Sequence, residues 1–266
     1  MDAVAERVQT DPRLRRRRRS VSRSRRRKLS TRAAAIAGVI GIVATVLWSP
    51  LLAVRDVKIL GARHTTVDEL AEALRVDERP NILTLSTAEM ERRAETLPWV
   101  SRARVDRSLP GTLRVRVVER RPAAVVALGA ARWTVDRKGN VLSSGGPKSL
   151  PVIAGTALDG IKPGTRLDSP EVRSALVAYA SMRSKLAKRV EAIFAPTTER
   201  ITMTLDGMQV RYGAAERLRA KNAVLRALLG RIGADAASVS YIDVRVPTSP
   251  AVGGLPVEAI APIPPG

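Results

Sequence analysis

The chain has 266 residues, 45% of them apolar, so it is long enough and apolar enough for one large or two small folded domains. It carries 46 lysine and arginine residues against 25 aspartate and glutamate residues, a formal net charge of +21. It contains no cysteine and a single histidine, His64. These counts exclude a disulfide framework, a thiol nucleophile, an iron–sulfur cluster and any metal site built from several histidines or cysteines.

The positive charge is concentrated at the beginning of the chain. Residues 1–32 contain 13 basic and 3 acidic side chains, with dense clusters at Arg15–Arg19 and Arg23–Lys28. So few apolar residues cannot bury a core, and the sequence predicts a disordered basic tail over residues 1–32. Anionic lipid is one candidate contact of this tail. Nucleic acid is another, but the tail lacks interleaved aromatic residues and a recognition fold, which argues against it.

An uncharged apolar segment follows the tail. Residues 33–54 contain no charged side chain, and as a helix they would span about 33 Å, enough for a bilayer core of about 30 Å. We interpret this segment as one uncleaved transmembrane helix, with a buried core helix and a cleaved signal peptide as the alternatives. The arginines before it predict a cytoplasmic N-terminus and extracytoplasmic C-terminal domains, a type II single-pass topology.

Small residues recur at every fourth position of this apolar segment, at Ala33, Ala37, Gly41 and Thr45. At helical spacing they form one stripe, on which another membrane helix could approach closely. In an alanine-rich segment such a stripe also arises by chance, so both interpretations stay open.

The next stretch predicts the order strand, helix, helix, strand, strand. Apolar and polar residues alternate over residues 54–60, which is typical of a strand. Thr66 with Glu69 and Ser86 with Glu89 have the spacing of capping boxes that open two helices. Two further strands follow, joined by a turn at residues 109–111.

This stretch resembles the POTRA domain of the FtsQ/DivIB family of cell-division proteins. The resemblance rests on a series of short segments in a fixed order: Val57–Ile59 with Gly61, Leu97–Val100, Ala103–Val105, Leu109–Pro110, Thr112–Leu113 and Glu119–Ala123. We expect Trp99 and Val100 to be core residues. The chain shows no second such unit and no series of barrel strands, which argues against a multi-POTRA outer-membrane transporter.

The remainder is similar to the second, larger β-domain of the same family. The pattern predicts a hairpin over residues 133–142, a strand near 150–155, a helix over 170–186 and strands at 190–194, 200–205 and 208–212. A last helix is expected over 214–229, and we interpret Arg217, Arg219, Lys221 and Arg226 as its solvated face. Strands at 241–246 and 249–254 complete the domain.

The last of these strands should be the edge of a sheet, and an unpaired edge can accept a strand from another protein. The resemblance implies that this region recruits the small bitopic division proteins FtsB and FtsL. It assigns partner binding to six positions: Asp243, Val244, Arg245, Ala251, Val252 and Gly253. Val246 and Gly254 depart from the family pattern, which has large aromatic residues there. Asp243 and Arg245 are equally compatible with an ordinary surface ion pair.

No catalytic group of residues emerges from the sequence. Asp136, Asp159, Asp168 and Asp206 all fall in predicted turns, where aspartate commonly bonds to its own backbone. We therefore expect no enzyme activity, no cofactor, no metal and no small-molecule substrate.

The sequence thus predicts an α+β protein in five parts: a basic tail (1–32), a transmembrane helix (33–54), a POTRA domain (55–122), a mixed β-domain with flanking helices (123–252) and a tail rich in proline and glycine (253–266). The expected function is that of a divisome scaffold, located in the inner membrane at the division septum, that recruits FtsB, FtsL and other divisome components to control septal peptidoglycan synthesis. A membrane-anchored POTRA chaperone and a membrane-tethered nucleic-acid binder are the alternatives.

Overall fold

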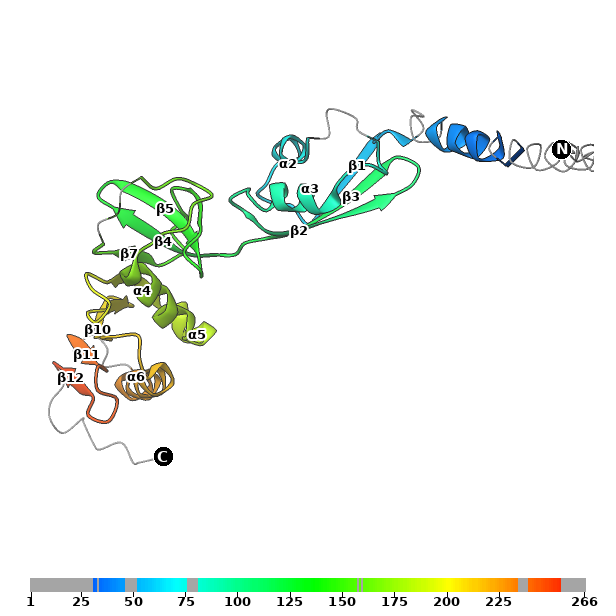
Figure 1. Cartoon of the computed structure of the whole chain (residues 1–266). Helices are drawn as coiled ribbons and strands as arrows, with labels where there is room; N and C mark the ends of the chain where they lie inside the picture. Colours follow the sequence, from blue (N-terminus) through cyan, green and yellow to red (C-terminus); the bar gives the residue numbers. More distant parts are fainter. Residues whose placement is uncertain are drawn as a thin grey trace, which may run out of the picture. The chain divides into compact units, whose positions relative to one another are not determined.

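The computed structural model describes residues 31–32, 34–45, 52–75, 81–156, 158, 160–233 and 239–254 (Figure 1). Internal contacts divide the chain into two compact units, residues 1–58, 76–86 and 106–114, and residues 59–75, 87–105 and 115–266. The expected basic tail lies almost entirely outside the described residues, as do Ala33, Asp159 and residues 255–266.

A helix covers residues 34–45, within the segment expected to cross the membrane. The Thr45 hydroxyl donates a hydrogen bond of 2.8 Å to the Gly41 carbonyl, so two residues of the small-residue stripe are joined within the helix. Ala37 lies on the same helix. Within the described ranges, no helix is both long enough and apolar enough to span a bilayer.

The first unit also contains the turn at residues 109–111, which was expected to join two strands. The Gly111 carbonyl accepts hydrogen bonds from the backbone N–H groups of Arg55 and Asp56, at 2.8 and 3.3 Å. A Cβ atom at Gly111 would lie 2.6 Å from the Ala53 carbonyl oxygen, so only glycine allows the two chain segments to approach this closely.

A three-stranded sheet has the order β1-β3-β2, built from β1 (Asp56–Leu60), β2 (Val100–Ser108) and β3 (Thr112–Glu119). Helices α2 (Val67–Leu74) and α3 (Thr87–Ala94) come between β1 and β2 in the chain and contact each other. The capping box at Thr66 is confirmed, because its side chain accepts from the Glu69 N–H and Glu69 accepts from the Thr66 N–H. The expected order strand, helix, helix, strand, strand is therefore correct.

A nine-stranded sheet has the order β12-β11-β10-β9-β8-β7-β4-β5-β6. The pairs β4–β7, β7–β8 and β10–β11 are parallel and the others are antiparallel, so the sheet is mixed. Its strands are β4 (Pro122–Leu128), β5 (Ala131–Asp136), β6 (Val141–Ser144), β7 (Val152–Ala154), β8 (Val190–Phe194), β9 (Thr202–Leu205), β10 (Met208–Arg211), β11 (Tyr241–Asp243) and β12 (Ala251–Gly253).

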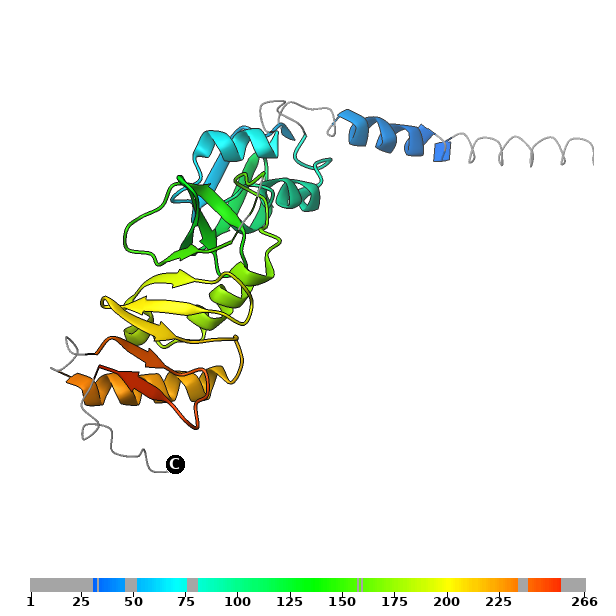
Figure 2. The same ribbon diagram turned by 90° about the vertical axis from the view of Figure 1, so that its left-hand side faces the viewer.

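Three helices belong to this sheet's domain: α4 (Pro170–Ala180), α5 (Ser184–Ala187) and α6 (Leu218–Ile232). Figure 2 shows the orange helix α6 running beside the red strands β11 and β12. The core contains α4, α6 and inward residues of the strands, among them Leu176, Leu225, Ile193, Val210 and Ile242. Along β10 burial alternates, so every second side chain of that strand faces solvent.

Two expectations about this domain are wrong in detail, and one strand, β4, was not predicted. In β4, Ala123, Ala124, Val125 and Val126 are all buried. The sequence there is apolar throughout and lacks the alternation of apolar and polar residues by which the other strands were predicted. The expected single helix over 170–186 is two helices, α4 and α5, separated by residues 181–183. The last helix begins at Leu218 and ends at Ile232, a few residues later at both ends than expected.

The basic face expected on the last helix also needs a correction. Arg217, Arg219 and Arg226 are exposed, but Lys221 is 3% exposed. Its ammonium group donates to the carbonyls of Tyr212 and Ala214, at 2.9 and 2.7 Å. Burial lowers the pKa of Lys221, and these two carbonyls supply the partners that a buried cation requires.

Candidate partner-binding edge of the nine-stranded sheet

Strand β12 lies at one end of the nine-stranded sheet. It pairs antiparallel with β11, with Tyr241 opposite Gly253, Ile242 opposite Val252 and Asp243 opposite Ala251. Among the strands that the structure describes, none lies on its other side. Within the described residues, no strand pairs with the backbone groups on that side, and an unpaired edge of this kind can accept a strand from another chain.

The six residues assigned to partner binding occupy β11, β12 and the residues just after β11. Asp243 faces Ala251 across the pair, and Ala251 is exposed. Val252 and Gly253 are half-buried, and Val252 packs against the domain core. Val244 is fully buried in that core, and its N–H donates to the Arg211 carbonyl at 3.0 Å. Any contribution of Val244 to binding would thus be through the position of the strand.

Asp243 and Arg245 form a close ion pair. Arg245 Nη2 lies 2.7 Å from Asp243 Oδ2, and the Arg245 Nε–H donates to the same carboxylate at 2.9 Å. The carboxylate side chain is 14% exposed and the guanidinium side chain 61%. Burial alone would raise the pKa of Asp243, but the hydrogen bonds and charge of Arg245 outweigh it and lower that pKa. The free side of the guanidinium faces solvent and can meet an anionic group.

Tyr241 is a site residue that the sequence reasoning did not single out. The Arg211 guanidinium carbon lies 4.0 Å from the centre of its ring, a cation–π contact. A Cβ atom at Gly253 would lie 2.2 Å from a carbon of the same ring, so the ring occupies the space above the glycine. The feature that brings Tyr241 to the site is the strand register, which places it opposite Gly253 on the adjacent strand.

Paired positions place one solvent-facing row across five strands, β8 to β12. Phe194 pairs with Thr202, Thr202 with Arg211, Arg211 with Asp243, and Asp243 with Ala251. Phe194, the only phenylalanine of the chain, is 53% exposed. Val246 is 49% exposed. The face next to the edge thus carries an aromatic ring, a cation and an ion pair.

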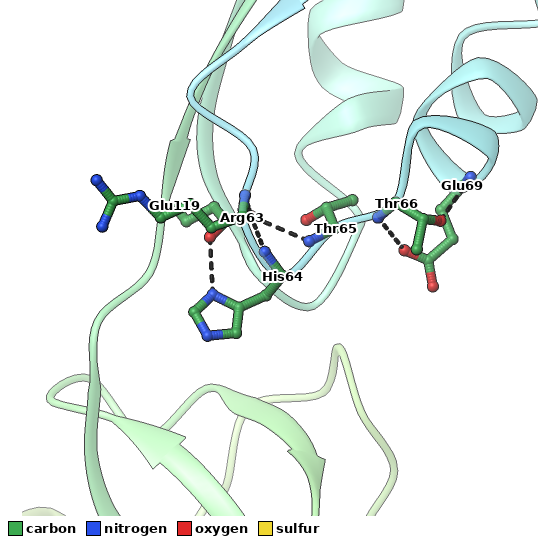
Figure 3. Close-up of polar contacts among 6 residues, drawn as sticks. All are labelled: Arg63, His64, Thr65, Thr66, Glu69 and Glu119. Carbon is green, nitrogen blue, oxygen red and sulfur yellow. Dashed lines mark hydrogen bonds and ion pairs between the residues drawn. The ribbon is translucent and has the colours of Figure 1, made fainter.

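A second organised polar cluster lies beside the three-stranded sheet (Figure 3). One Glu119 carboxylate oxygen accepts the backbone N–H groups of Arg63, His64 and Thr65, at 2.8, 2.8 and 3.0 Å. The other oxygen lies 2.9 Å from His64 Nδ1. Burial would raise the pKa of Glu119, but these hydrogen bonds together lower it to about 2. An ionised carboxylate only accepts, so His64 Nδ1 carries the proton of that bond.

The His64 ring also stacks on Trp99, with ring centres 4.1 Å apart and planes 6° from parallel. His64 lies in a loop before the capped helix, as expected. Trp99 is half-buried and contacts this ring, whereas it was expected to be a core residue; Val100 is fully buried, as expected. The contact joins residues far apart in the sequence, which local patterns do not reveal.

The described aspartates that were expected in turns bond to backbone N–H groups or pair with arginines of the same domain. Asp136 accepts from the N–H groups of Lys138 and Asn140 at 2.8 and 2.9 Å. Asp206 pairs with Arg189, and Asp168 pairs with Arg173. Over the described ranges, no group of three or more histidine, aspartate or glutamate residues is arranged to hold a metal ion.

Comparison with known proteins agrees with this architecture. Residues 52–120 match the POTRA domain, FtsQ-type, and residues 124–245 match the Cell division protein FtsQ/DivIB, C-terminal family. The Cell division protein FtsQ of Mycobacterium tuberculosis H37Rv is 30% identical over 217 residues, covering 81% of this chain and 67% of that relative. The chain belongs to the FtsQ/DivIB family of cell-division proteins.

Two further relatives of the family are similar to the chain. The FtsQ of Mycobacteroides abscessus is 31% identical over 196 residues, 73% of this chain and 61% of that protein's own length. The solved extracytoplasmic domain of the division protein DivIB from Geobacillus stearothermophilus is 18% identical, with a TM-score of 0.31, and the match covers 42% of this chain and 92% of that one. The region that matches the FtsQ-type POTRA domain contains the Glu119 cluster. The region that matches the FtsQ/DivIB C-terminal family contains β11.

Proposed function

We propose that the protein is a single-pass membrane scaffold of the divisome, and that its β12 edge recruits small bitopic division proteins of the FtsB and FtsL kind. Membership of the FtsQ/DivIB family supports the division role. The observation that carries the recruitment proposal is the position of β12 at the end of the sheet, with one side unpaired among the described strands.

The mechanism of recruitment is strand addition. A partner strand beside β12 would satisfy the open backbone groups, and these main-chain bonds supply affinity without requiring a particular sequence. Specificity would come from the neighbouring side chains. The Arg245 guanidinium, 61% exposed beside Asp243, offers donors to a partner carboxylate, and Tyr241 with Arg211 offers a flat contact surface.

The membrane topology is part of the same proposal. The uncharged segment 33–54 would anchor the chain, and the 13 basic residues before it would hold the N-terminus in the cytoplasm. Both folded domains would then lie outside the cytoplasm, where septal peptidoglycan is made. Binding at the β12 edge would bring the partners to that place.

The test replaces Val252 by proline in the full chain and measures partner recovery. Val252 is the central residue of β12, and proline removes a backbone donor and resists strand pairing. The matched control is Ser144→Pro, at the end of β6, which is the strand at the opposite end of the same sheet. Each protein is purified from its native membrane and co-purifying proteins are identified by mass spectrometry.

We expect wild type and Ser144→Pro to retain FtsB- and FtsL-like proteins and Val252→Pro to lose them. Thermal unfolding of each variant checks that the domain remains folded. Retention by a folded Val252→Pro would place the interface elsewhere. The absence of such partners from wild type would reject the recruitment proposal and leave the chaperone alternative.

A further inference from the structure

A basic cavity is lined by residues of α5, α6 and their neighbours, and none of the residues assigned to partner binding lines it. It has a volume of about 600 Å³ and is lined by residues 183–186, Arg189, Arg226, Leu229 and Gly230. Leu186 and Leu229 are buried side chains of the domain and give the cavity apolar walls. The cations Arg183, Lys185, Arg189 and Arg226 line the same cavity.

The charged side chains in the two segments that line this cavity are all positive. Residues 181–189 and 217–233 together contain nine lysines and arginines and no aspartate or glutamate. Arg189 pairs with Asp206 at 2.6 Å, and the Arg226 Nε–H donates to the Asn222 carbonyl at 3.3 Å. Arg183 and Lys185 are exposed and form no ion pair with any residue that the structure describes. The site is thus electrostatically complementary to an anionic ligand.

We propose that this cavity, the α5–α6 site, binds an acidic amphipathic segment of a partner protein. Apolar side chains of the segment contact Leu186 and Leu229, and its carboxylates pair with the cations at the rim. Arg183 and Lys185 come from the α5 side and Arg226 from α6, so several separate carboxylates are matched better than one compact anion.

The size of the cavity favours a protein segment over a lipid. A cube of 600 Å³ has an edge of about 8 Å, whereas each acyl chain of a bilayer lipid covers about half of a core of about 30 Å. The cavity accommodates a few side chains and is too short for a pair of acyl chains. The ligand class is therefore an acidic peptide, and a lipid surface becomes an outcome of the test.

Gly230 provides a way to block the site without changing its charge. It lines the cavity on α6, and a Cβ atom there would meet no other atom within 4 Å. Gly230→Trp is expected to fill the cavity, and Gly230→Ala leaves it open and favours the helix. The second test variant, Arg183→Glu/Lys185→Glu, reverses the two unpaired cations. Its matched control is Lys148→Glu/Lys162→Glu, two exposed lysines of the same domain.

The measurement is fluorescence anisotropy of a labelled helical peptide of about 16 residues, with leucines on one face and glutamates on the other. The full chain in neutral detergent is the binding protein. We expect both the charge reversal and Gly230→Trp to weaken binding about tenfold or more. Gly230→Ala and the Lys148/Lys162 control should stay within about twofold of wild type.

Several outcomes would overturn the proposal. Equal weakening by the two charge reversals would mean that only the net charge attracts the peptide. Unchanged binding by Gly230→Trp would show that the cavity is not occupied. Loss of binding to phosphatidylglycerol vesicles in the α5–α6 variants, without any peptide binding by wild type, would assign the site to lipid. Val252→Pro should keep full peptide affinity, which separates this site from the β12 edge.

Discussion

At the level of single residues, Glu119 is a carboxylate whose pKa is strongly lowered by its surroundings. Its pKa falls from 4.5 to about 2, because three backbone N–H groups and His64 stabilise the ionised form. A group whose pKa is depressed by folding stabilises the native state above its unfolded pKa. That contribution is lost as the pH falls from 4.5 through about 2.

We predict that Glu119→Gln lowers the free energy of unfolding by about 2–3 kcal/mol at neutral pH, because the amide loses the charge on which the four hydrogen bonds depend. Urea denaturation of both proteins at pH 7 and near pH 2 measures the difference. The gap between variant and wild type should close toward the acid end. A gap that stays constant over this range would show that the carboxylate charge is not responsible.

His64→Ala is the control for this prediction. It removes only the side-chain contact with Glu119 and Trp99 and leaves the three backbone donors in place. Its loss of stability should be smaller than that of Glu119→Gln.

Lys221 illustrates why single-residue burial is difficult to predict. Its helix has exposed arginines on either side of it in sequence, and the pattern alone places it with them. The two carbonyls that receive its ammonium group belong to residues 212 and 214, before the helix begins. The burial depends on the path of that preceding loop, which a helical pattern does not contain.

At the level of elements, the sequence predicted correctly the helix starts that depend on neighbouring residues. The capping box of α2 and the proline start of α4 depend on residues within one turn, and both are present in the structure. Strand β4 depends on distant partners, because it lies between β7 and β5 and is buried along four consecutive residues. A strand covered on both faces loses the alternation by which strands are recognised.

At the candidate site, too, one feature was predictable from the sequence and another was not. The edge position of the last strand followed from its place at the end of the domain, and the structure agrees. The Tyr241–Arg211 contact could not be predicted, because β10 and β11 pair in parallel across the whole of α6. Only the register of that pair places the ring beside the guanidinium.

We predict that Gly253→Val detaches β12 from β11, because a side chain there would overlap the Tyr241 ring. The readout is amide hydrogen exchange of residues 249–254, which should become faster, and loss of partner recovery should accompany it. Tyr241→Ala in the Gly253→Val background removes the overlap, so exchange should return toward the wild-type rate. Faster exchange that persists in the double variant would point to backbone conformation as the cause.

At the level of the whole molecule, charge and topology are connected. The excess of basic residues before the apolar segment is the feature from which the orientation was inferred. We predict that a periplasmically active phosphatase fused to the C-terminus is active in wild type. Replacing the arginines and lysine of Arg15–Arg19 and Arg23–Lys28 by glutamine should reduce that activity by inverting part of the population.

A charge-matched control replaces an equal number of basic residues within the folded domains. The fusion should keep its activity there, because domains far from a membrane segment have little influence on orientation. Equal activity in the tail variant would contradict the proposed role of the arginines.

The strand order of the larger sheet has a consequence for how the protein matures. Along the sheet from β9 to β12 the strands follow their order in the chain, and among the described strands β12 pairs only with β11. A chain that leaves the ribosome N-terminus first must release β10, α6 and β11 before β12 has anything to pair with. The proposed docking edge can therefore form only after β12, the last described strand of the sheet, has been synthesised. A chain that stops before Ala251 would lack β12, so recruitment at this edge would report that synthesis had passed the last strand of the sheet.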